Sequence, residues 1–210
     1  MLEFRNVSLI YDSKTIFSRL NFKIHSGEKI LLKGPSGSGK SSILDLIMGF
    51  NLPNEGELFW KLASYSQLEI QTIRRDLAWV PQNLKLFPSG STISGIQSIF
   101  DNKLNKSNQP EISKIYALAK ELNLAEEQLR NDYTSLSGGE SQRIAIICSL
   151  LLNRELSLMD EPTSALDNTT AQKAMKLILS NTKTLLCISH SSEFDNLFDR
   201  IIYIGGENGN

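Results

Sequence analysis

The sequence predicts an α/β fold in which a mostly parallel sheet carries helices on both faces. Over residues 140–210, short apolar segments alternate with helix-length segments, the order that produces parallel sheets. Residues 1–32 hold three strand patterns separated by turn residues, which indicates an antiparallel β subdomain at the N-terminus. Residues 83–135 break this alternation and indicate an inserted α-helical subdomain. We therefore expect a single domain over residues 1–210, with its core in 1–82 and 136–210 and the insert at about 83–135.

Composition is that of a globular protein able to bury a large core. Of the 210 residues, 40% are hydrophobic and 21% charged, and the net charge is −1. This balance gives no overall attraction to nucleic acid, so we expect no nucleic-acid partner. Because no segment approaches the roughly 20 apolar residues of a membrane helix and the N-terminus lacks a signal-peptide pattern, we expect a cytoplasmic protein.

The two cysteines point to the same compartment. Cys148 and Cys187 lie inside apolar segments, where an unpaired cysteine packs as a small hydrophobic side chain. We expect buried, reduced thiols, the usual state in the cytosol. The sequence alone leaves a disulfide between them as the alternative.

The first half of the chain contains four predicted strands and one predicted helix. The strands cover residues 2–7, 20–24, 29–32 and 77–80. A helix is predicted over 41–48, where the apolar pattern stops at Gly49. Residues 53–56 contain proline, asparagine and glycine and indicate a turn.

The second half begins with the insert and returns to strand–helix alternation. A helix is predicted over 110–122, with Pro110 in its first turn and an apolar stripe formed by Ile112, Ile115, Leu118, Ala119 and Leu122. The remaining elements are a helix ending at Leu152, a strand over 156–159, a helix over 169–179 and strands over 184–188 and 200–204.

A phosphate-binding loop is the most specific motif. Residues 34–41 fit the pattern G-x-x-x-x-G-K-[ST], between a predicted strand and a predicted helix. The glycines let backbone N–H groups approach phosphate oxygens, and the helix directs its positive dipole end toward the same anion. Lys40 can reach the outer phosphates, and the Ser41 hydroxyl is a hard ligand suited to Mg²⁺. The sequence therefore predicts nucleotide binding here.

Two acidic residues follow the strand over 156–159. In a parallel sheet, ligands collect at the carboxyl ends of strands. Asp160 is thus positioned to hold Mg²⁺ and Glu161 to act as general base toward an attacking water. Taken alone, the pair could equally begin a solvated loop, and it is the phosphate loop in the same chain that favours the catalytic interpretation.

A second glycine-bearing helix start lies at residues 136–140. Ser137 and Glu140 have the spacing of a capping box, which is a sufficient structural explanation for both. It does not explain Gly138 and Gly139, since each glycine in a helix costs about 1 kcal/mol against alanine. Glycines here suit close approach of a ligand to the backbone, and a phosphate is the natural candidate.

Together these motifs resemble those of the ATP-binding cassette (ABC) family. Residues 34–41 are similar to its Walker A motif, 156–161 to Walker B with the catalytic glutamate, and 136–140 with Gln142 and Arg143 to its signature motif. Four further positions fit family motifs: Gln82 the Q-loop, residues 164–167 the D-loop, His190 the switch histidine and Tyr11 the aromatic that stacks on adenine.

The resemblance implies an ATPase that uses Mg²⁺. Glu161, His190 and Gln82 would be its catalytic residues, and Ser41, Gln82 and Asp160 its metal ligands. The residues implied to bind ATP are Tyr11, Gly34, Pro35, Ser36, Gly37, Ser38, Gly39, Lys40, Ser41, Ser42, Ser137, Gly138, Gly139 and Asp167. Family members work as head-to-tail dimers, so Ser137, Gly138 and Gly139 would bind the ATP of a second copy or of a homologous cassette.

Three departures from the family pattern leave these groups in place. The signature motif ends in Glu140 where glutamine is commoner, and Walker B carries Ser157 and Met159 in a usually aliphatic stretch. An arginine that often follows the signature motif is replaced in the segment 147–150. None removes a catalytic group, so we expect active ATP hydrolysis.

The family resemblance implies a transporter subunit. A separate membrane permease would dock near residues 82–96, so we expect the chain on the cytoplasmic face of the inner membrane. Residues 86–93 also resemble small bacterial exporter-like cassettes proposed to act in metal or iron export. A soluble non-transport ABC ATPase, acting in cofactor assembly or on DNA or translation, is the alternative, although no sustained heptads of the DNA-organising type occur here.

Overall fold

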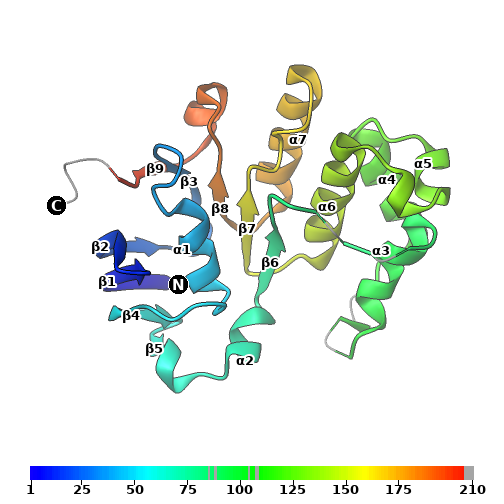
Figure 1. Cartoon of the computed structure of the whole chain (residues 1–210). Helices are drawn as coiled ribbons and strands as arrows, with labels where there is room; N and C mark the ends of the chain where they lie inside the picture. Colours follow the sequence, from blue (N-terminus) through cyan, green and yellow to red (C-terminus); the bar gives the residue numbers. More distant parts are fainter. Residues whose placement is uncertain (85, 88, 104, 107–108, 206–210) are drawn as a thin grey trace.

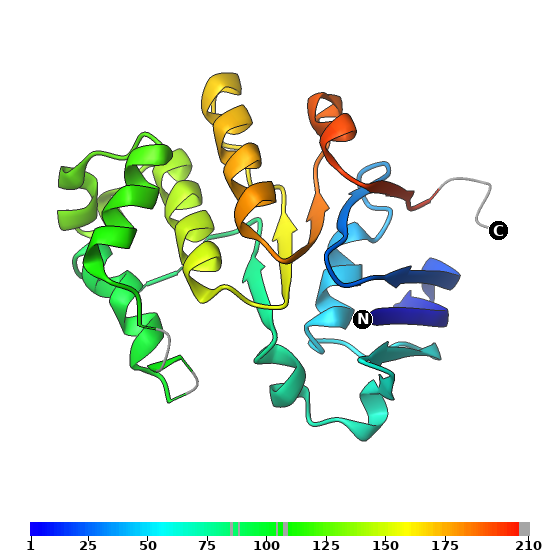
Figure 2. The same cartoon turned by 180° about the vertical axis from the view of Figure 1, so that it is seen from behind.

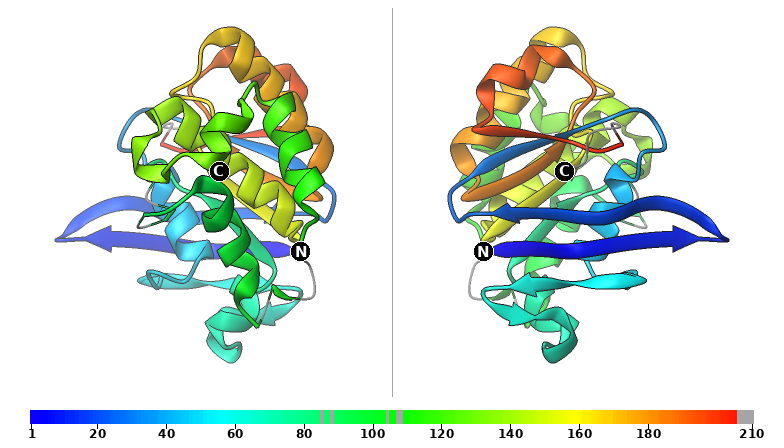
Figure 3. Two further views of the ribbon diagram at one scale, coloured as in Figure 1. Left: turned by 90° about the vertical axis from the view of Figure 1, so that its right-hand side faces the viewer. Right: turned by 90° about the vertical axis from the view of Figure 1, so that its left-hand side faces the viewer.

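The chain forms two sheets that lie in separate layers (Figures 1 and 3). The computed structural model describes residues 1–84, 86–87, 89–103, 105–106 and 109–205. The first sheet is antiparallel, in the order β2-β1-β4-β5. Its strands are β1 (Leu2–Tyr11), β2 (Lys14–Ile24), β4 (Glu55–Trp60) and β5 (Ala63–Ser64). The predicted N-terminal antiparallel β subdomain is therefore confirmed, but the third strand predicted within residues 1–32 belongs to the parallel sheet as β3 (Lys29–Lys33), and β4 and β5 complete the antiparallel sheet instead.

The second sheet is parallel throughout, in the order β6-β7-β8-β3-β9. Its strands are β3 (Lys29–Lys33), β6 (Leu77–Val80), β7 (Leu156–Asp160), β8 (Thr184–Ile188) and β9 (Arg200–Tyr203). Asp160 pairs with Ile188, and Ile188 with Leu32, so three strands end level with one another. β7 and β8 are buried along their whole length, as expected of strands covered on both faces.

Helices cover both faces of the parallel sheet. Helix α1 (Lys40–Ile47) packs between the two sheets, because its apolar side chains join one core with those of β1, β3 and β7. Helices α6 (Gly138–Leu152) and α7 (Asn168–Asn181) share a second core with the other face of β3, β7 and β8. The predicted α/β fold is therefore confirmed.

The insert is helical and packs on α6, at the opposite end of the molecule from the antiparallel sheet (Figures 1 and 2). Its helices are α3 (Thr92–Asp101), α4 (Ile112–Glu121) and α5 (Glu126–Arg130). Further helical elements among the described residues are α2 (Ile70–Arg74) and the 3₁₀ turns Tyr65–Gln67, Tyr133–Ser135 and Ser192–Leu197. Because α6 is covered by the sheet on one side and the insert on the other, its residues are buried almost all round.

The sequence predicted the long, strongly patterned elements and was wrong at some boundaries. α4 begins at Ile112, after the extended residue Glu111, so Pro110 precedes the helix rather than forming its first turn. Ile112 is 50% exposed and does not belong to the buried stripe, which starts at Ile115. β4 begins at Glu55, inside the predicted turn over 53–56.

The structure shows the state of both cysteines and the length and polarity of the described helices. Cys148 and Cys187 are buried free thiols, so the disulfide alternative is wrong. Burial raises the pKa of the Cys148 thiol to about 12 and also raises that of Cys187. Within the described ranges, the helices are too short or too polar to traverse a lipid bilayer.

Candidate nucleotide site

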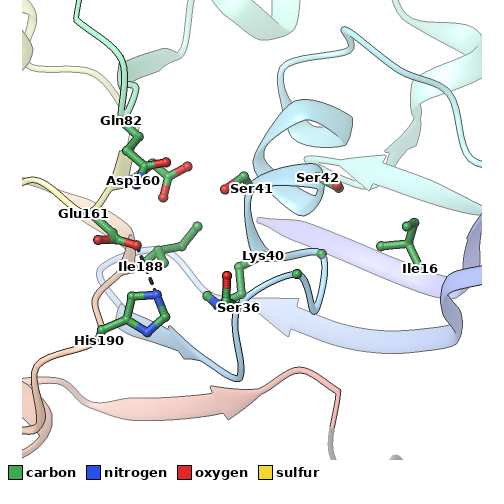
Figure 4. A pocket seen from close by; sticks show the side chains of 12 residues that line it. Ile16, Ser36, Lys40, Ser41, Ser42, Gln82, Asp160, Glu161, Ile188 and His190 are labelled. Carbon is green, nitrogen blue, oxygen red and sulfur yellow. Dashed lines mark ion pairs between the residues drawn. The ribbon is translucent and has the colours of Figure 1, made fainter. Parts of the chain in front are cut away.

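A cavity of about 240 Å³ opens where the parallel strands end (Figure 4). One wall is the loop between β3 and α1 together with the start of α1. The other wall carries residues that follow β6, β7 and β8. The lining residues are Ile16, Ser36, Gly37, Gly39, Lys40, Ser41, Ser42, Gln82, Asp160, Glu161, Ile188 and His190.

The glycine loop wraps around the Lys40 ammonium. Nζ of Lys40 donates hydrogen bonds to the carbonyl oxygens of Gly34 (2.9 Å) and Pro35 (2.8 Å), so the charge stays inside the loop. Gly39 begins α1 at a φ of 91°, and a Cβ there would lie 2.5 Å from the side chain of Ile16. Only glycine fits this conformation and spacing. The loop therefore presents its backbone and one cation to the cavity.

Asp160 closes the far side of the cavity at the end of β7. It is 7% exposed, and burial raises the pKa of its carboxyl above the ordinary value. A hydrogen bond from the Ser41 hydroxyl and the charge of Lys40 act in the opposite direction. Ser41 and Asp160 are thus oxygen donors within reach of each other across the cavity, and the Gln82 amide also lines it.

Glu161 follows in an unusual backbone conformation. Its φ is 51°, a left-handed conformation that is uncommon for a residue with a side chain. Its N–H donates to the carbonyl of Ile188 (3.0 Å), and its Oε1 lies 3.1 Å from Nε2 of His190. The carboxylate therefore points into the cavity in contact with the imidazole (Figure 4).

Several predicted residues lie outside the cavity lining. Tyr11 ends β1 and is 38% exposed, while Ile16 of β2 takes part in the wall instead. Gly34, Pro35 and Ser38 belong to the loop but do not line the cavity. Asp167 caps α7 through a hydrogen bond from the Thr170 N–H (3.0 Å).

The signature turn (residues 137–139) also lies away from this cavity. Ser137 caps α6 and Glu140 completes the capping box, with Oε2 accepting from the Ser137 N–H at 2.8 Å. A Cβ at Gly138 would meet nothing within 4 Å, and Ser137 and Gly138 are exposed. The turn thus offers an accessible helix start to something outside the chain's own cavity.

The sequence did not predict that Ile16 and Ile188 line the cavity, or that the Gln142 side chain contacts the segment that follows β7. Ile16 and Ile188 carry no motif that could have marked them. Gln142 is recognisable from sequence only as part of the signature motif, yet its side chain bonds to residues 161–165 (below). That contact joins distant parts of the chain and has no local sequence signal.

A glycine loop between a strand and a helix encloses a lysine, and acids at the end of another strand of the same parallel sheet face it. This arrangement defines a P-loop nucleotide-binding protein. Residues 17–164 match the ABC transporter family, and the chain belongs to that family of ATP-binding cassettes.

The relatives are transporter ATP-binding proteins. The chain is 31% identical to the uncharacterized ABC transporter ATP-binding protein MJ0796 of Methanocaldococcus jannaschii, over 97% of this chain and 93% of that protein. It is 30% identical to the arginine transport ATP-binding protein ArtM of Bacillus subtilis, over 97% and 87%. It also matches the lacticin-481/lactococcin-DR transport/processing ATP-binding protein lcnDR3 of Lactococcus lactis at 34%, but spans only 29% of that protein.

Solved structures agree in fold. The ATP-binding cassette MJ0796, solved as a dimer in a post-hydrolysis state with ADP and Pi, has a TM-score of 0.82 at 29% identity, over 97% of this chain and 94% of that one. A bacterial Atm1-family ABC exporter with ATP bound has a TM-score of 0.84 at 28% identity, over 97% of this chain and 37% of that one.

Proposed function

We propose that this chain is the ATP-hydrolysing subunit of an ABC transporter, which drives a separate membrane permease by ATP-dependent head-to-tail dimerisation. The observation that carries the proposal is the separation, in one chain, of the cavity around Lys40 and the signature turn, the two features predicted to bind phosphate. The cavity lined by Lys40 is open to solvent, and the exposed signature turn lies outside this cavity. A second chain in the opposite orientation would bring the two features together, and the dimeric state of the MJ0796 cassette supports such an arrangement.

Within one cavity, the roles follow from the donors available. Backbone N–H groups of residues 36–42 and the Lys40 ammonium would hold the phosphates. Ser41, Gln82 and Asp160 are hard oxygen donors and fit Mg²⁺, which favours one or two carboxylates plus phosphate oxygens. When bound, the ion would neutralise charge on the phosphates. Tyr11 is our candidate for adenine stacking, at the open side near β2.

Glu161 would act as general base. Its carboxylate accepts a proton from the attacking water as the new oxygen–phosphorus bond forms and the bond to the β-phosphate oxygen breaks. Nε2 of His190 contacts the same carboxylate and would orient it, and the imidazole would also contact the γ-phosphate. Across the dimer, Ser137, Gly138 and Gly139 would meet that phosphate, and Asp167 would lie at the contact between subunits. Loss of the bridging phosphate would reopen the dimer.

The permease would dock on the groove between the core and the insert, near residues 82–96, at the cytoplasmic face of the membrane. Residues 83–135 would form the insert that transmits this contact. Among these, Pro88 of the exporter-like segment lies outside the described residues.

The test uses Glu161→Gln with ATP and Mg²⁺. We expect ATP binding with very slow hydrolysis, and elution as a dimer in size-exclusion chromatography. Wild-type protein with ADP should elute as a monomer. An ATP-loaded variant that stays monomeric at high concentration would contradict the shared site. Purification from detergent-extracted membranes tests the transporter role: stimulation of the ATPase by a co-purifying membrane-spanning protein is expected, and a purely soluble complex would favour the non-transport alternative.

A further inference from the structure

The Gln142 side chain forms hydrogen bonds with the loop that carries Glu161. Gln142 lies on α6, one turn beyond the signature turn, and is only 2% exposed. Its Nε2 donates to the carbonyl oxygen of Glu161 (2.8 Å) and to Oγ of Ser164 (3.3 Å). Its Oε1 accepts from the N–H of Ala165 (2.9 Å). One buried amide thus uses both its donor and its acceptor on residues 161–165.

One of these hydrogen bonds is made to Glu161, whose backbone is strained. A left-handed conformation at a residue with a side chain costs on the order of 1–3 kcal/mol and persists only where the surroundings enforce it. At Glu161 three hydrogen bonds do so: its N–H donates to Ile188, and its carbonyl accepts from the Ser164 N–H (3.2 Å) and from Gln142. Of these donors, only Gln142 comes from a side chain.

The same face of α6 touches the loop a second time. A Cβ at Gly139 would lie 2.8 Å from the carbonyl oxygen of Ala165, so the two backbones are in close contact. Gly139 and Gln142 are three residues apart and therefore lie on one face of the helix. The start of α6 and residues 161–165 consequently form one packed unit.

We propose that Gln142 is a positioning residue for Glu161: its amide holds the left-handed turn that directs the carboxylate toward the attacking water. This inference rests on the proposed role of Glu161 as general base. Gln142 does not line the cavity, and the hydrogen bonds of its side chain go to residues 161–165 and not to the glycine loop around Lys40. Its loss should therefore lower kcat and leave ATP affinity unchanged.

Two substitutions separate hydrogen bonding from packing. Gln142→Met keeps the length of the side chain and removes its polar atoms. Gln142→Glu is nearly isosteric and still accepts from Ala165, but when ionised it cannot donate to the Glu161 carbonyl. We expect both to lower kcat by about 10- to 100-fold, the range that a small misplacement of a catalytic group produces. ATP affinity, measured by titration, should stay within about twofold, since the residues around Lys40 are untouched.

Ser149→Ala is the matched control. Ser149 is buried on the same helix, and its Oγ has no hydrogen-bond partner among the described residues. We expect unchanged kcat and melting temperature. If Gln142→Met fails to fold, the more conservative Gln142→Glu carries the test. Normal kcat in a folded Gln142→Met protein, or in a folded Gln142→Glu protein at a pH at which the introduced carboxyl is ionised, would overturn the inference, because packing alone would then suffice.

The decisive measurement is the double variant Gln142→Met with Glu161→Gln, in single-turnover hydrolysis of radiolabelled ATP. If Gln142 acts through Glu161, the double variant is as slow as Glu161→Gln alone. A further loss equal to that seen in wild-type protein would mean a general structural role and overturn the inference. Full activity of Glu161→Gln itself would instead overturn the proposed base, whatever Gln142 does.

Discussion

Nε2 of His190 lies 3.1 Å from Oε1 of Glu161, and this contact joins residues that follow two neighbouring strands of the parallel sheet. In the proposed mechanism the imidazole orients the carboxylate, so His190→Ala should lower kcat by about 100-fold, the lower end of the range for a positioned acid–base group. Steady-state ATPase assays at saturating ATP check this. His25→Ala, at the chain's one other histidine, which is exposed, is the control and should be unaffected. A kcat within about twofold of wild type in His190→Ala would rule out an orienting role.

Lys40→Ala should weaken ATP binding. The ammonium lies inside the glycine loop on the carbonyls of Gly34 and Pro35, where an outer phosphate of ATP could compete for it. Since a charge-assisted hydrogen bond contributes about 1.5–3 kcal/mol, we expect a loss of about 10- to 100-fold in affinity. Isothermal titration with ATP measures it.

Lys183→Ala serves as the control for removal of one lysine. Its ammonium pairs with Glu155 (2.8 Å) on the exposed surface, remote from the cavity lining. Affinity should not change. Equal affinities of the Lys40→Ala and wild-type proteins would refute phosphate binding by Lys40.

The raised pKa of Asp160 predicts a pH-dependent cost to the nucleotide-free protein. Burial raises this pKa in the folded state, so the folded protein binds more protons than the unfolded chain at intermediate pH. The cost is absent below the ordinary carboxyl pKa of about 4 and grows as pH rises through the raised value. Asp160→Asn removes the charge. We expect it to melt at a higher temperature than wild type at mildly alkaline pH, with the difference shrinking as pH falls.

Addition of ATP and Mg²⁺ should reverse this order. The wild-type protein gains stability from the ligand, whereas the amide introduced by Asp160→Asn is a poor substitute for a carboxylate toward the ion. Asp12→Asn, an exposed acid in the β1–β2 turn, controls for loss of one negative charge. If Asp160→Asn melts below wild type without nucleotide at every pH, burial of the charge is not the dominant effect.

Features that depend on one short segment could be predicted from the sequence, whereas features that depend on the packing of distant segments could not. The phosphate loop and Asp160–Glu161 were found because their chemistry fixes residue types at fixed spacing. β7, β8 and α6 could be predicted because most of the residues in each are apolar. In β4, the buried residues Leu58 and Trp60 alternate with less buried ones, so this strand does carry a local sequence signal.

Other features have no local signal. The entry of Ile16 into the cavity wall, while Tyr11 stays outside the lining, depends on the irregular register between β1 and β2. The bond between Gln142 and Glu161 depends on how α6 packs against the end of β7. Both are properties of the assembled sheets and helices, which no short segment encodes.

The two glycines of the signature turn should respond differently to alanine. At Gly139 a Cβ would lie 2.8 Å from the backbone oxygen of Ala165, which cannot move without shifting residues 161–165. We expect Gly139→Ala to lose about 1–3 kcal/mol of stability, the usual cost of overpacking, and to lose activity with it. Chemical denaturation measures the first effect and ATPase assays the second.

At Gly138 a Cβ would meet nothing within 4 Å, so the free subunit has room for it. Because alanine is the better helix former by about 0.5–1 kcal/mol, Gly138→Ala should fold at least as stably as wild type and bind ATP normally. The added methyl would stand between this helix start and the partner's phosphate. In the Glu161→Gln background, Gly138→Ala should therefore abolish the ATP-dependent dimer in size-exclusion chromatography. A dimer that forms as readily with alanine at this position would remove the signature turn from the shared site, because no ligand could then be approaching its backbone closely.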